Sequence, residues 1–282
     1  MYETFYGLRE PAFSLTPDPR FLWLSETHQE GLSALIYGIT RRKGFMLLTG
    51  EVGTGKTTLL RAALGQIPRD TDTALVLNTT GLGPIDLLKL IGAEFGFESR
   101  LESKADHLIA LNRMLLDRLR ARRNTVLIID EAQNLDAPAL EEIRLLSNLE
   151  TDTEKLMQIV LTGQPELMRK LSHPNLRQLR QRIAIEHHMQ PLGPDEMEPY
   201  LQHRLQVAGV AYDQVFVPGS EPTFYWFSSG CPRLISLLAD RVLLAAYAKQ
   251  LRPIPPEFVE EKAKAMGATH AVGLGDSPRL ET

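Results

Sequence analysis

The chain has 282 residues, of which 43% are hydrophobic, and a formal net charge of −4. This length suffices for one large or two ordinary domains with a substantial core. The acidic balance argues against a globally basic nucleic-acid-binding protein, and no apolar run approaches the ~20 residues of a membrane-spanning helix. The single cysteine, Cys231, excludes an internal disulfide framework, and the N-terminus lacks the basic and apolar order of a signal peptide. These features favour a cytoplasmic protein.

The first part of the chain predicts an arm followed by a helix. Pro11, Pro17 and Pro19 interrupt the first twenty residues, and an amphipathic helical pattern follows from about 27 to 42. We expect residues 1–43 to pack on the core formed by the next segment.

Residues 44–190 alternate short apolar strands with helices. The expected strands are 45–48, 74–77, 125–129 and 158–161, and the expected helices lie near 57–66, 84–95, 105–122 and 137–149. Because unbroken runs of Val, Ile and Leu separated by helices are typical of a parallel sheet covered on both faces, this segment is predicted to be an α/β domain.

A phosphate-binding loop follows the first of these strands. Residues 50–57 read Gly-Glu-Val-Gly-Thr-Gly-Lys-Thr, between an apolar strand and a helix. The glycines let backbone N–H groups wrap an anion, and the helix N-terminus adds positive charge. Lys56 is expected to reach the β and γ phosphates of a nucleotide, and the Thr57 hydroxyl to ligate Mg²⁺.

An acidic pair, Asp130 and Glu131, ends the strand at 125–129. Asp130 is expected to hold Mg²⁺ directly or through water, and Glu131 to orient and deprotonate the attacking water. A solvated acidic pair is the alternative. The phosphate loop about seventy residues upstream favours the catalytic interpretation, because ligands of open α/β sheets lie at the carboxyl ends of strands.

Polar residues follow two other strands. Asn78 ends the strand at 74–77, where its amide would hydrogen-bond Glu131, unless it is an ordinary turn asparagine. Gln164 follows the strand at 158–161 and is expected to touch the γ-phosphate or the attacking water. Thr162 is the competing candidate for that role.

Three arginines after Pro174 are candidates for a residue that a neighbouring subunit supplies to the phosphates. Such a residue accelerates phosphoryl transfer by about 10³- to 10⁵-fold. Arg182 is the first choice, Arg180 the second and Arg177 the third, with a solvated helix surface as the alternative.

From Pro191 the pattern predicts a small helical lid over 191–267 and a disordered tail over 268–282. Its helices are expected near 194–208, 221–229, 232–249 and 256–266. Pro232 is expected in the first turn of the third of these helices, followed by Arg233. Because a helix N-terminus is positive, an arginine there favours a nearby anion, such as the γ-phosphate, and an ordinary surface arginine is the alternative.

Several motifs together resemble one protein family. They are Phe5-Tyr6-Gly7-Leu8, Thr16-Pro17-Asp18-Pro19-Arg20-Phe21, Gly163-Gln164-Pro165-Glu166-Leu167, Leu179-Arg180-Gln181-Arg182-Ile183 and Pro232-Arg233-Leu234-Ile235. With the phosphate loop and the acidic pair, they resemble the AAA+ ATPases, and within them the group typified by general secretion pathway protein A. The resemblance covers roughly residues 1–265.

The resemblance implies an α/β P-loop NTPase core with a parallel sheet in three layers and an all-helical lid, binding ATP and Mg²⁺ between subunits of a homo-oligomeric ring or filament. The residues that it assigns to the nucleotide are Gly50, Glu51, Val52, Gly53, Thr54, Gly55, Lys56, Thr57 and Thr58 of the Walker A loop. It further assigns the Walker B roles to Asp130 and Glu131, sensor 1 to Gln164 or Thr162, the arginine finger to Arg182 or a neighbour, and sensor 2 to Arg233.

Two functions follow as hypotheses. The first is ATP hydrolysis that drives assembly or remodelling of a bacterial envelope machine of the secretion or pilus type, with the chain peripheral to the inner membrane through a protein partner. The second is an ATP-dependent DNA-binding oligomer that regulates transposition, as in the related TnsC-type ATPases. The net charge does not indicate DNA, but two segments are locally basic: one holds Arg113, Arg118, Arg120, Arg122 and Arg123, and the other holds Arg41, Arg42 and Lys43. Solvated helix surfaces are the alternative for both segments, and the acidic balance of the chain favours that alternative.

Overall fold

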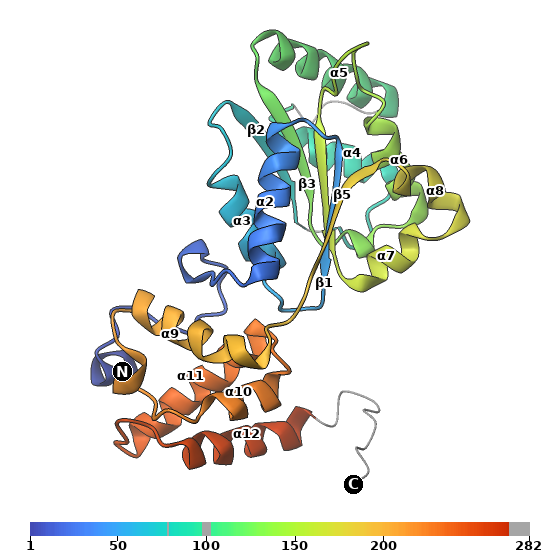
Figure 1. Cartoon of the computed structure of the whole chain (residues 1–282). Coiled ribbons are helices and arrows are strands. Elements are labelled where there is room, and N and C mark those ends of the chain that lie inside the picture. Colours follow the sequence, from blue (N-terminus) through green and yellow to red (C-terminus); the bar gives the residue numbers. More distant parts are fainter. Residues whose placement is uncertain (78, 98–102, 271–282) are drawn as a thin grey trace. The chain divides into compact units, whose positions relative to one another are not determined.

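The computed structural model describes residues 1–77, 79–97 and 103–270. They form two units (Figure 1). Each unit has its own apolar core. The α/β unit consists of residues 26–52 and 56–190. The helical unit consists of residues 1–25, 53–55 and the described residues from Pro191 onward.

The α/β unit is built on a five-stranded sheet in the order β2-β3-β4-β1-β5, with every neighbouring pair parallel. The strands are β1 (Phe45–Gly50), β2 (Thr71–Val76), β3 (Asn124–Ile129), β4 (Gln158–Gly163) and β5 (Ile183–Met189). The parallel sheet predicted from the apolar runs is confirmed. In β1 and β4 every residue is buried, because helices cover both faces of these central strands.

The sequence pattern did not predict β5. This strand lies at the sheet edge and reads Ile-Ala-Ile-Glu-His-His-Met, in which the exposed positions alternate with partly buried ones. An edge strand has one covered face and needs no continuous apolar run, so it lacks the signal that identified the other four.

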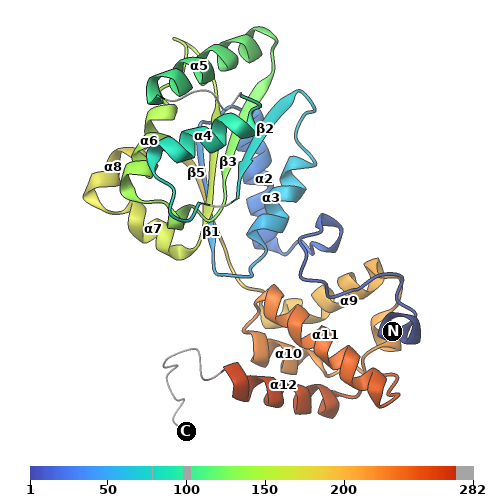
Figure 2. The ribbon, with the colours of Figure 1, turned by 180° about the vertical axis from the view of Figure 1, so that it is seen from behind.

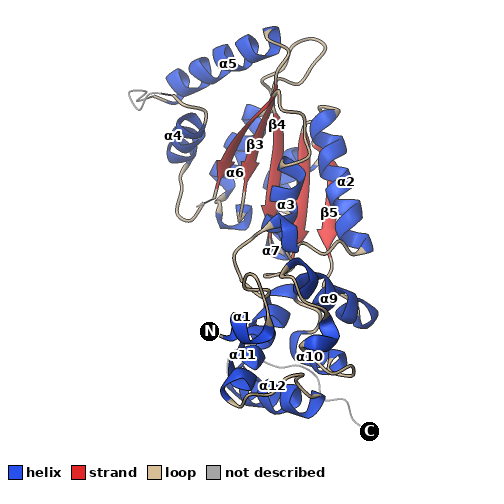
Figure 3. Cartoon of the chain, turned by 90° about the vertical axis from the view of Figure 1, so that its left-hand side faces the viewer, coloured by secondary structure: helices blue, strands red, loops and turns tan. Residues whose placement is uncertain are grey.

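Helices cover the two faces of this sheet. Their bounds are α2 (Glu26–Thr40), α3 (Lys56–Leu64), α4 (Pro84–Glu94), α5 (Lys104–Arg120), α6 (Ala137–Leu146), α7 (Pro165–Leu171) and α8 (Arg177–Arg180). Figure 3 shows α2 and α3 together on one face, whereas Figure 2 shows α4, α6, α7 and α8 on the other. Local signals fix the helix starts: the Ser103 hydroxyl caps α5, and the Asp136 carboxylate accepts the Ala139 N–H at 2.8 Å at the start of α6.

The helical unit contains α1 (Tyr2–Tyr6), α9 (Met197–Val207), α10 (Glu221–Ser228), α11 (Pro232–Ala248) and α12 (Pro256–His270). The expected tail began at residue 268, but α12 continues to His270, and residues 271–282 lie outside the described residues. Short 3₁₀ turns in the two units are Pro19–Phe21, Ala132–Asn134, Pro174–Leu176, Pro194–Glu196 and Tyr212–Gln214.

Residues 1–25 complete the core of the helical unit, whereas α2 packs in the α/β unit, so of the arm and helix expected on the α/β core only the helix lies there. Tyr6, Phe13 and Phe21 are buried in one cluster with side chains of α9, α10, α11 and α12. The Arg204 guanidinium of α9 donates to the Ala12 carbonyl oxygen at 2.7 Å, and this hydrogen bond holds residues 1–25 against α9. The helices alone would leave this apolar surface uncovered, and the aromatic side chains of the arm cover it. Figure 2 shows the arm beside α9 and α11.

Among the described residues, no helix combines the length and the apolar content that crossing a bilayer requires.

Candidate nucleotide-binding site

The loop between β1 and α3 has the backbone of a phosphate cradle. Gly53 and Gly55 adopt φ angles of 86° and 96°, in the left-handed region that favours glycine, and α3 begins at Lys56. The Lys56 side chain is 5% exposed, and its ammonium donates to the carbonyl oxygens of Gly50 at 2.8 Å and Glu51 at 3.0 Å. The loop carbonyls therefore hold the lysine charge close to the backbone N–H groups that would receive an anion.

A hydrogen bond joins this loop to the acidic strand end. The Thr57 hydroxyl donates to Asp130 Oδ2 at 3.0 Å. Asp130 is 5% exposed, and its Oδ1 accepts from the Thr162 hydroxyl and from the Glu131 N–H at 2.9 Å. Three segments thus converge on one buried carboxylate. Hydroxyl and carboxylate oxygens are the ligand type that Mg²⁺ prefers, so Thr57 and Asp130 fit a magnesium site.

Glu131 lies beyond Asp130 at a sharp turn. Its backbone is left-handed, with φ 51° and ψ 39°, which is strained for a residue with a side chain. The Glu131 Oε2 accepts from the amides of Gln133 at 2.5 Å and Gln164 at 3.2 Å, and its backbone oxygen accepts from the Thr79 hydroxyl at 2.8 Å. These contacts fix a carboxylate beside the loop in one orientation.

The two candidates after β4 lie differently. Thr162 is fully buried and binds Asp130, whereas Gln164 is partly buried, directly precedes α7 and faces Glu131. Asn78 lies outside the described residues.

Sequence reasoning missed Gln133, Thr79 and Lys170. Gln133 stands two positions after Glu131, and Thr79 one position after Asn78, so proximity to the motif was the only signal. The Lys170 ammonium donates to the carbonyl oxygens of Gln133 and Leu135, both at 2.6 Å, and no local pattern indicates this contact.

The three candidate arginines differ in their contacts. The Arg182 guanidinium donates to the Arg144 carbonyl oxygen at 3.1 Å and to the Ser147 hydroxyl, at the C-terminal end of α6. Arg180 pairs with Glu186 at 3.3 Å. Arg177 is exposed, and no hydrogen bond or ion pair engages its side chain within the described part of the chain. Arg182 therefore contributes to packing within the α/β unit, whereas the Arg177 guanidinium is not engaged by any described residue.

Arg233 lies in the first turn of α11, directly after Pro232, as predicted. Within the helical unit its backbone N–H donates to the Gly53 oxygen at 3.2 Å. A Cβ atom at Gly53 would lie 2.6 Å from the Arg233 Cβ, so position 53 has no room for a side chain.

Comparison with known proteins agrees with this geometry. An AAA domain model matches residues 39–171. The chain is 47% identical over 257 residues to general secretion pathway protein A of Aeromonas hydrophila. The aligned region covers 88% of this chain and 45% of that protein. The chain thus spans less than half the length of this relative.

Solved structures share the fold at low sequence identity. The ORC2 protein of Aeropyrum pernix, in ADPNP-ADP complexes, superposes with a TM-score of 0.68 at 18% identity, over 90% of this chain and 71% of that chain. The Drosophila ORC bound to DNA superposes with a TM-score of 0.70 at 16% identity, over 96% and 67% of the two chains. The chain is therefore an AAA-domain P-loop protein related to general secretion pathway protein A, which confirms the family and the fold class that the sequence predicts.

Proposed function

We propose that this protein hydrolyses ATP with Mg²⁺. The observation that carries the proposal is the 3.0 Å hydrogen bond from Thr57 to Asp130, which brings the phosphate loop and the acidic strand end into one site. In this site Lys56 and the loop N–H groups would bind the phosphates, and Glu131 would orient and deprotonate the attacking water. Thr57 and Asp130 would hold Mg²⁺, which neutralises charge on the phosphate oxygens.

Further residues of the same site have proposed roles. Gln164 would sense the γ-phosphate or the water, since its amide already lies 3.2 Å from Glu131. Thr162 would instead orient Asp130. Arg233 would sense the γ-phosphate, and the role of Asn78 stays a prediction. We assign nucleotide binding to residues 44–190 and the lid role to residues 191–267.

The substitution Glu131→Gln tests hydrolysis. The variant should bind ATP as the wild type does but lose turnover by roughly 10²-fold or more, because it removes the base and leaves the phosphate contacts. Lys56→Ala should weaken both binding and turnover. The measurements are phosphate release and titration with a fluorescent ATP analogue. Wild-type phosphate release by the Glu131→Gln variant would refute the assignment.

We propose that ATP binds between subunits of a homo-oligomer, with an arginine donated in trans. The sequence favours Arg182 as this arginine, but its guanidinium is hydrogen-bonded to the end of α6. Arg177 is the better candidate, because its guanidinium is exposed and no described residue engages it. In mixtures with Glu131→Gln subunits, Arg177→Ala subunits should recover activity, because some interfaces then combine an intact Glu131 with an intact Arg177. The variants Arg180→Ala and Arg182→Ala are the matched controls. Recovery with Arg182→Ala alone would return the role to Arg182.

The proposed output is assembly or remodelling of a bacterial envelope machine of the secretion or pilus type. The similarity to general secretion pathway protein A of Aeromonas hydrophila supports secretion. We place the protein in the cytoplasm, peripheral to the inner membrane through a protein partner. Co-purification with components of such a machine, dependent on Lys56, is the experiment that tests this part of the proposal.

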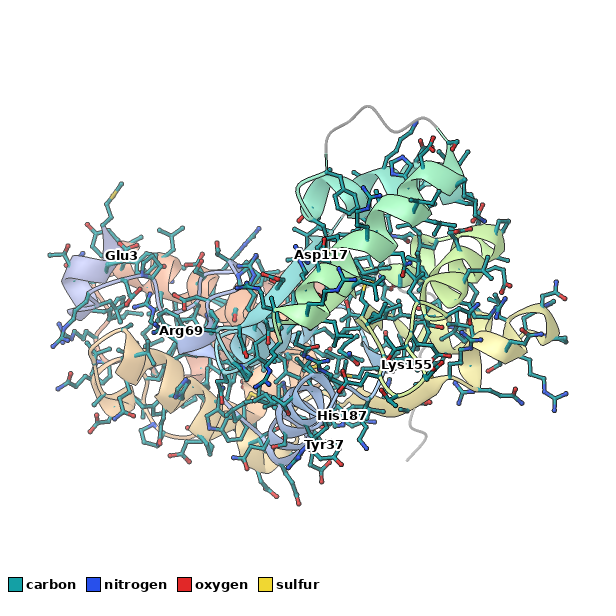
Figure 4. The ribbon with its side chains drawn as sticks, turned by 90° about the horizontal axis from the view of Figure 1, so that it is seen from above. Glu3, Tyr37, Arg69, Asp117, Lys155 and His187 are labelled. Carbon is teal, nitrogen blue, oxygen red and sulfur yellow. The ribbon has the colours of Figure 1, made fainter. Side chains whose placement is uncertain are left out.

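One observation favours the second function, DNA binding. Because the strands are parallel, the segments that enter them meet at one edge of the sheet, opposite the candidate site. We call this the amino-terminal edge and define it by residues 41–44, 69–72, 113–124 and 154–155. Arg42 connects two of these segments, since its guanidinium pairs with Glu154 at 3.1 Å and donates to the Arg123 oxygen at 3.3 Å. Figure 4 labels three residues from this part of the unit, Arg69, Asp117 and Lys155.

The amino-terminal edge carries uncompensated positive charge. Several of its cations have no carboxylate partner among the described residues: Arg41, Lys43, Arg69, Arg113 and Arg122. Guanidinium groups suit phosphate, and the related Drosophila ORC fold was solved bound to DNA. Affinity for duplex DNA with a non-hydrolysable ATP analogue should fall steeply with salt, and Arg41→Ala combined with Arg122→Ala should reduce that slope. Absence of binding at low salt would eliminate this function.

A further inference from the structure

The amide of Gln133 fills a slot between three residues of the candidate site. It contacts the Glu131 carboxylate and the backbone of Gln164, and its oxygen occupies space that a side chain at Gly163 would need. All four residues belong to the α/β unit. None of the roles described above uses Gln133.

The backbone determines the orientation of this amide. The Gln164 N–H must donate, and it does so to Gln133 Oε1 at 3.1 Å. The nitrogen Nε2 therefore faces Glu131, 2.5 Å from Oε2. A flipped amide would place a nitrogen against the Gln164 N–H and an oxygen against the carboxylate, so both contacts would become repulsive.

Neighbouring residues leave space for the Gln133 side chain and hold the turn that carries it. A Cβ atom at Gly163 would lie 2.7 Å from Gln133 Oε1 and 2.8 Å from Leu167 Cδ2, so a side chain at 163 would press on the amide and on Leu167. Lys170 holds the turn that carries Gln133 by donating to two of its carbonyl oxygens, each at 2.6 Å. Gly163, Lys170 and the Gln164 N–H group thus all help to fix the position of the Gln133 side chain.

We propose that Gln133 is the positioning residue for Glu131, an inference that rests on the proposed hydrolysis. Gln133 and Gln164 both donate to Oε2, whereas Oε1 accepts no hydrogen bond from any described residue. Binding one oxygen fixes the rotation of the carboxylate and leaves the other oxygen available to take the proton of the water. Because misplacing a catalytic group by about 1 Å can cost roughly 10²-fold in rate, loss of this contact should lower kcat strongly.

The substitution Gln133→Glu isolates the contact. It retains the size of the side chain and an oxygen for the Gln164 N–H, but it replaces the donor to Glu131 with a like charge. We expect kcat to fall about 10- to 100-fold, with the KM for ATP and the affinity for a fluorescent ATP analogue unchanged. Gln133→Leu and Gly163→Ala, which remove or displace the amide without adding charge, should show the same split. Gln206→Glu, at an exposed position on α9, is the matched control and should match the wild type.

A double-substitution cycle separates positioning from a structural role. If Gln133 acts through Glu131, adding Gln133→Glu to the Glu131→Gln variant should not lower the residual rate further. A full additional loss in that background, or wild-type kcat in a folded Gln133→Leu variant, would overturn the inference while leaving hydrolysis intact. Equal phosphate release by the wild type and Glu131→Gln would instead refute the role of Glu131 as the base, and absence of phosphate release by the wild type would refute the proposed hydrolysis itself. Thermal melting of each variant identifies those that fold, and the affinity for the ATP analogue confirms that their binding loop is intact.

Discussion

At the scale of single residues, the site depends on one buried carboxylate with matched donors. Asp130 is 5% exposed and accepts from Thr57, from Thr162 and from the Glu131 N–H. A buried charge that keeps its hydrogen bonds is tolerated, whereas loss of one donor leaves part of its desolvation cost uncompensated. Thr162 is therefore expected to contribute to stability as well as to the site.

The substitution Thr162→Val tests this role with almost no change of shape. It should lower the free energy of unfolding by about 1–3 kcal/mol, because it removes a donor to a buried carboxylate. Thr73→Val is the matched control, since Thr73 is exposed on β2 and should change stability by about 0.5 kcal/mol or less. Urea denaturation measures both. Equal effects at the two positions would show that the Asp130 contact does not stabilise the fold.

At the scale of elements, an ion pair ties the edge strand β2 to α5. Asp72 of β2 pairs with Arg118 of α5 at 3.2 Å and with Arg123, and the Arg118 guanidinium lies 4.9 Å from the centre of the Phe95 ring. The hydrogen bond from Arg123 holds the pKa of Asp72 below its usual range, whereas burial lowers the pKa of Arg118. The pairing therefore favours the charged form of Asp72 in the folded state.

This pairing predicts a pH dependence of stability. A carboxyl group with a folded-state pKa below its unfolded value stabilises the fold above the unfolded pKa of about 3.9, and the effect is lost as the pH falls through the folded pKa. Asp72→Asn should cost about 1 kcal/mol at pH 7, and its difference from the wild type should shrink as the pH falls below 4. Urea titrations across this range measure it, with the exposed Asp117→Asn as control. A difference that grows at low pH would contradict the prediction.

The elements that the sequence revealed are those whose signal is local. The strands β1 and β3 carry continuous apolar runs, and the phosphate loop and acidic pair follow them directly, so the fold class and the positions of these two motifs at strand ends were predictable. The edge strand β5, with Glu186, His187 and His188, has no such run. A strand of this kind is recognisable only once its neighbour β1 is known.

Tertiary contacts explain the remaining differences. Gln133 receives its role from Gln164 and Gly163, which follow it by about thirty positions. The engagement of Arg182 depends on the end of α6, more than thirty residues earlier in the chain. Patterns in short windows contain no information on such pairs, because the partners meet only when the sheet has formed.

At the scale of the whole molecule, the helical unit is assembled from distant parts of the sequence. Its core joins residues 1–25 to α9, α10, α11 and α12, and Phe13 is 1% exposed within that cluster. The N-terminal segment is thus part of the hydrophobic core of this unit.

The substitution Phe13→Ala tests this arrangement. It should lower the stability of the helical unit by about 3–5 kcal/mol, the usual cost of removing a buried aromatic ring. Hydrogen exchange resolved by segment should show lost protection in α9, α10 and α11, with β1, β3 and β4 retaining theirs. Lost protection confined to the sheet would instead place the arm on the α/β core. Leu15→Ala, at an exposed position, is the control.

The discontinuous helical unit imposes an order on biosynthesis. A ribosome delivers residues 1–25 long before Pro191, and at about 5–20 residues per second the intervening chain takes on the order of ten seconds to emerge. During that interval Tyr6, Phe13 and Phe21 have no core to enter, and the α/β unit is translated completely before the helices of their own unit emerge. The growing polypeptide therefore exposes the aromatic side chains of residues 1–25, and chaperones that recognise apolar segments have time to bind them before α9, α10, α11 and α12 emerge.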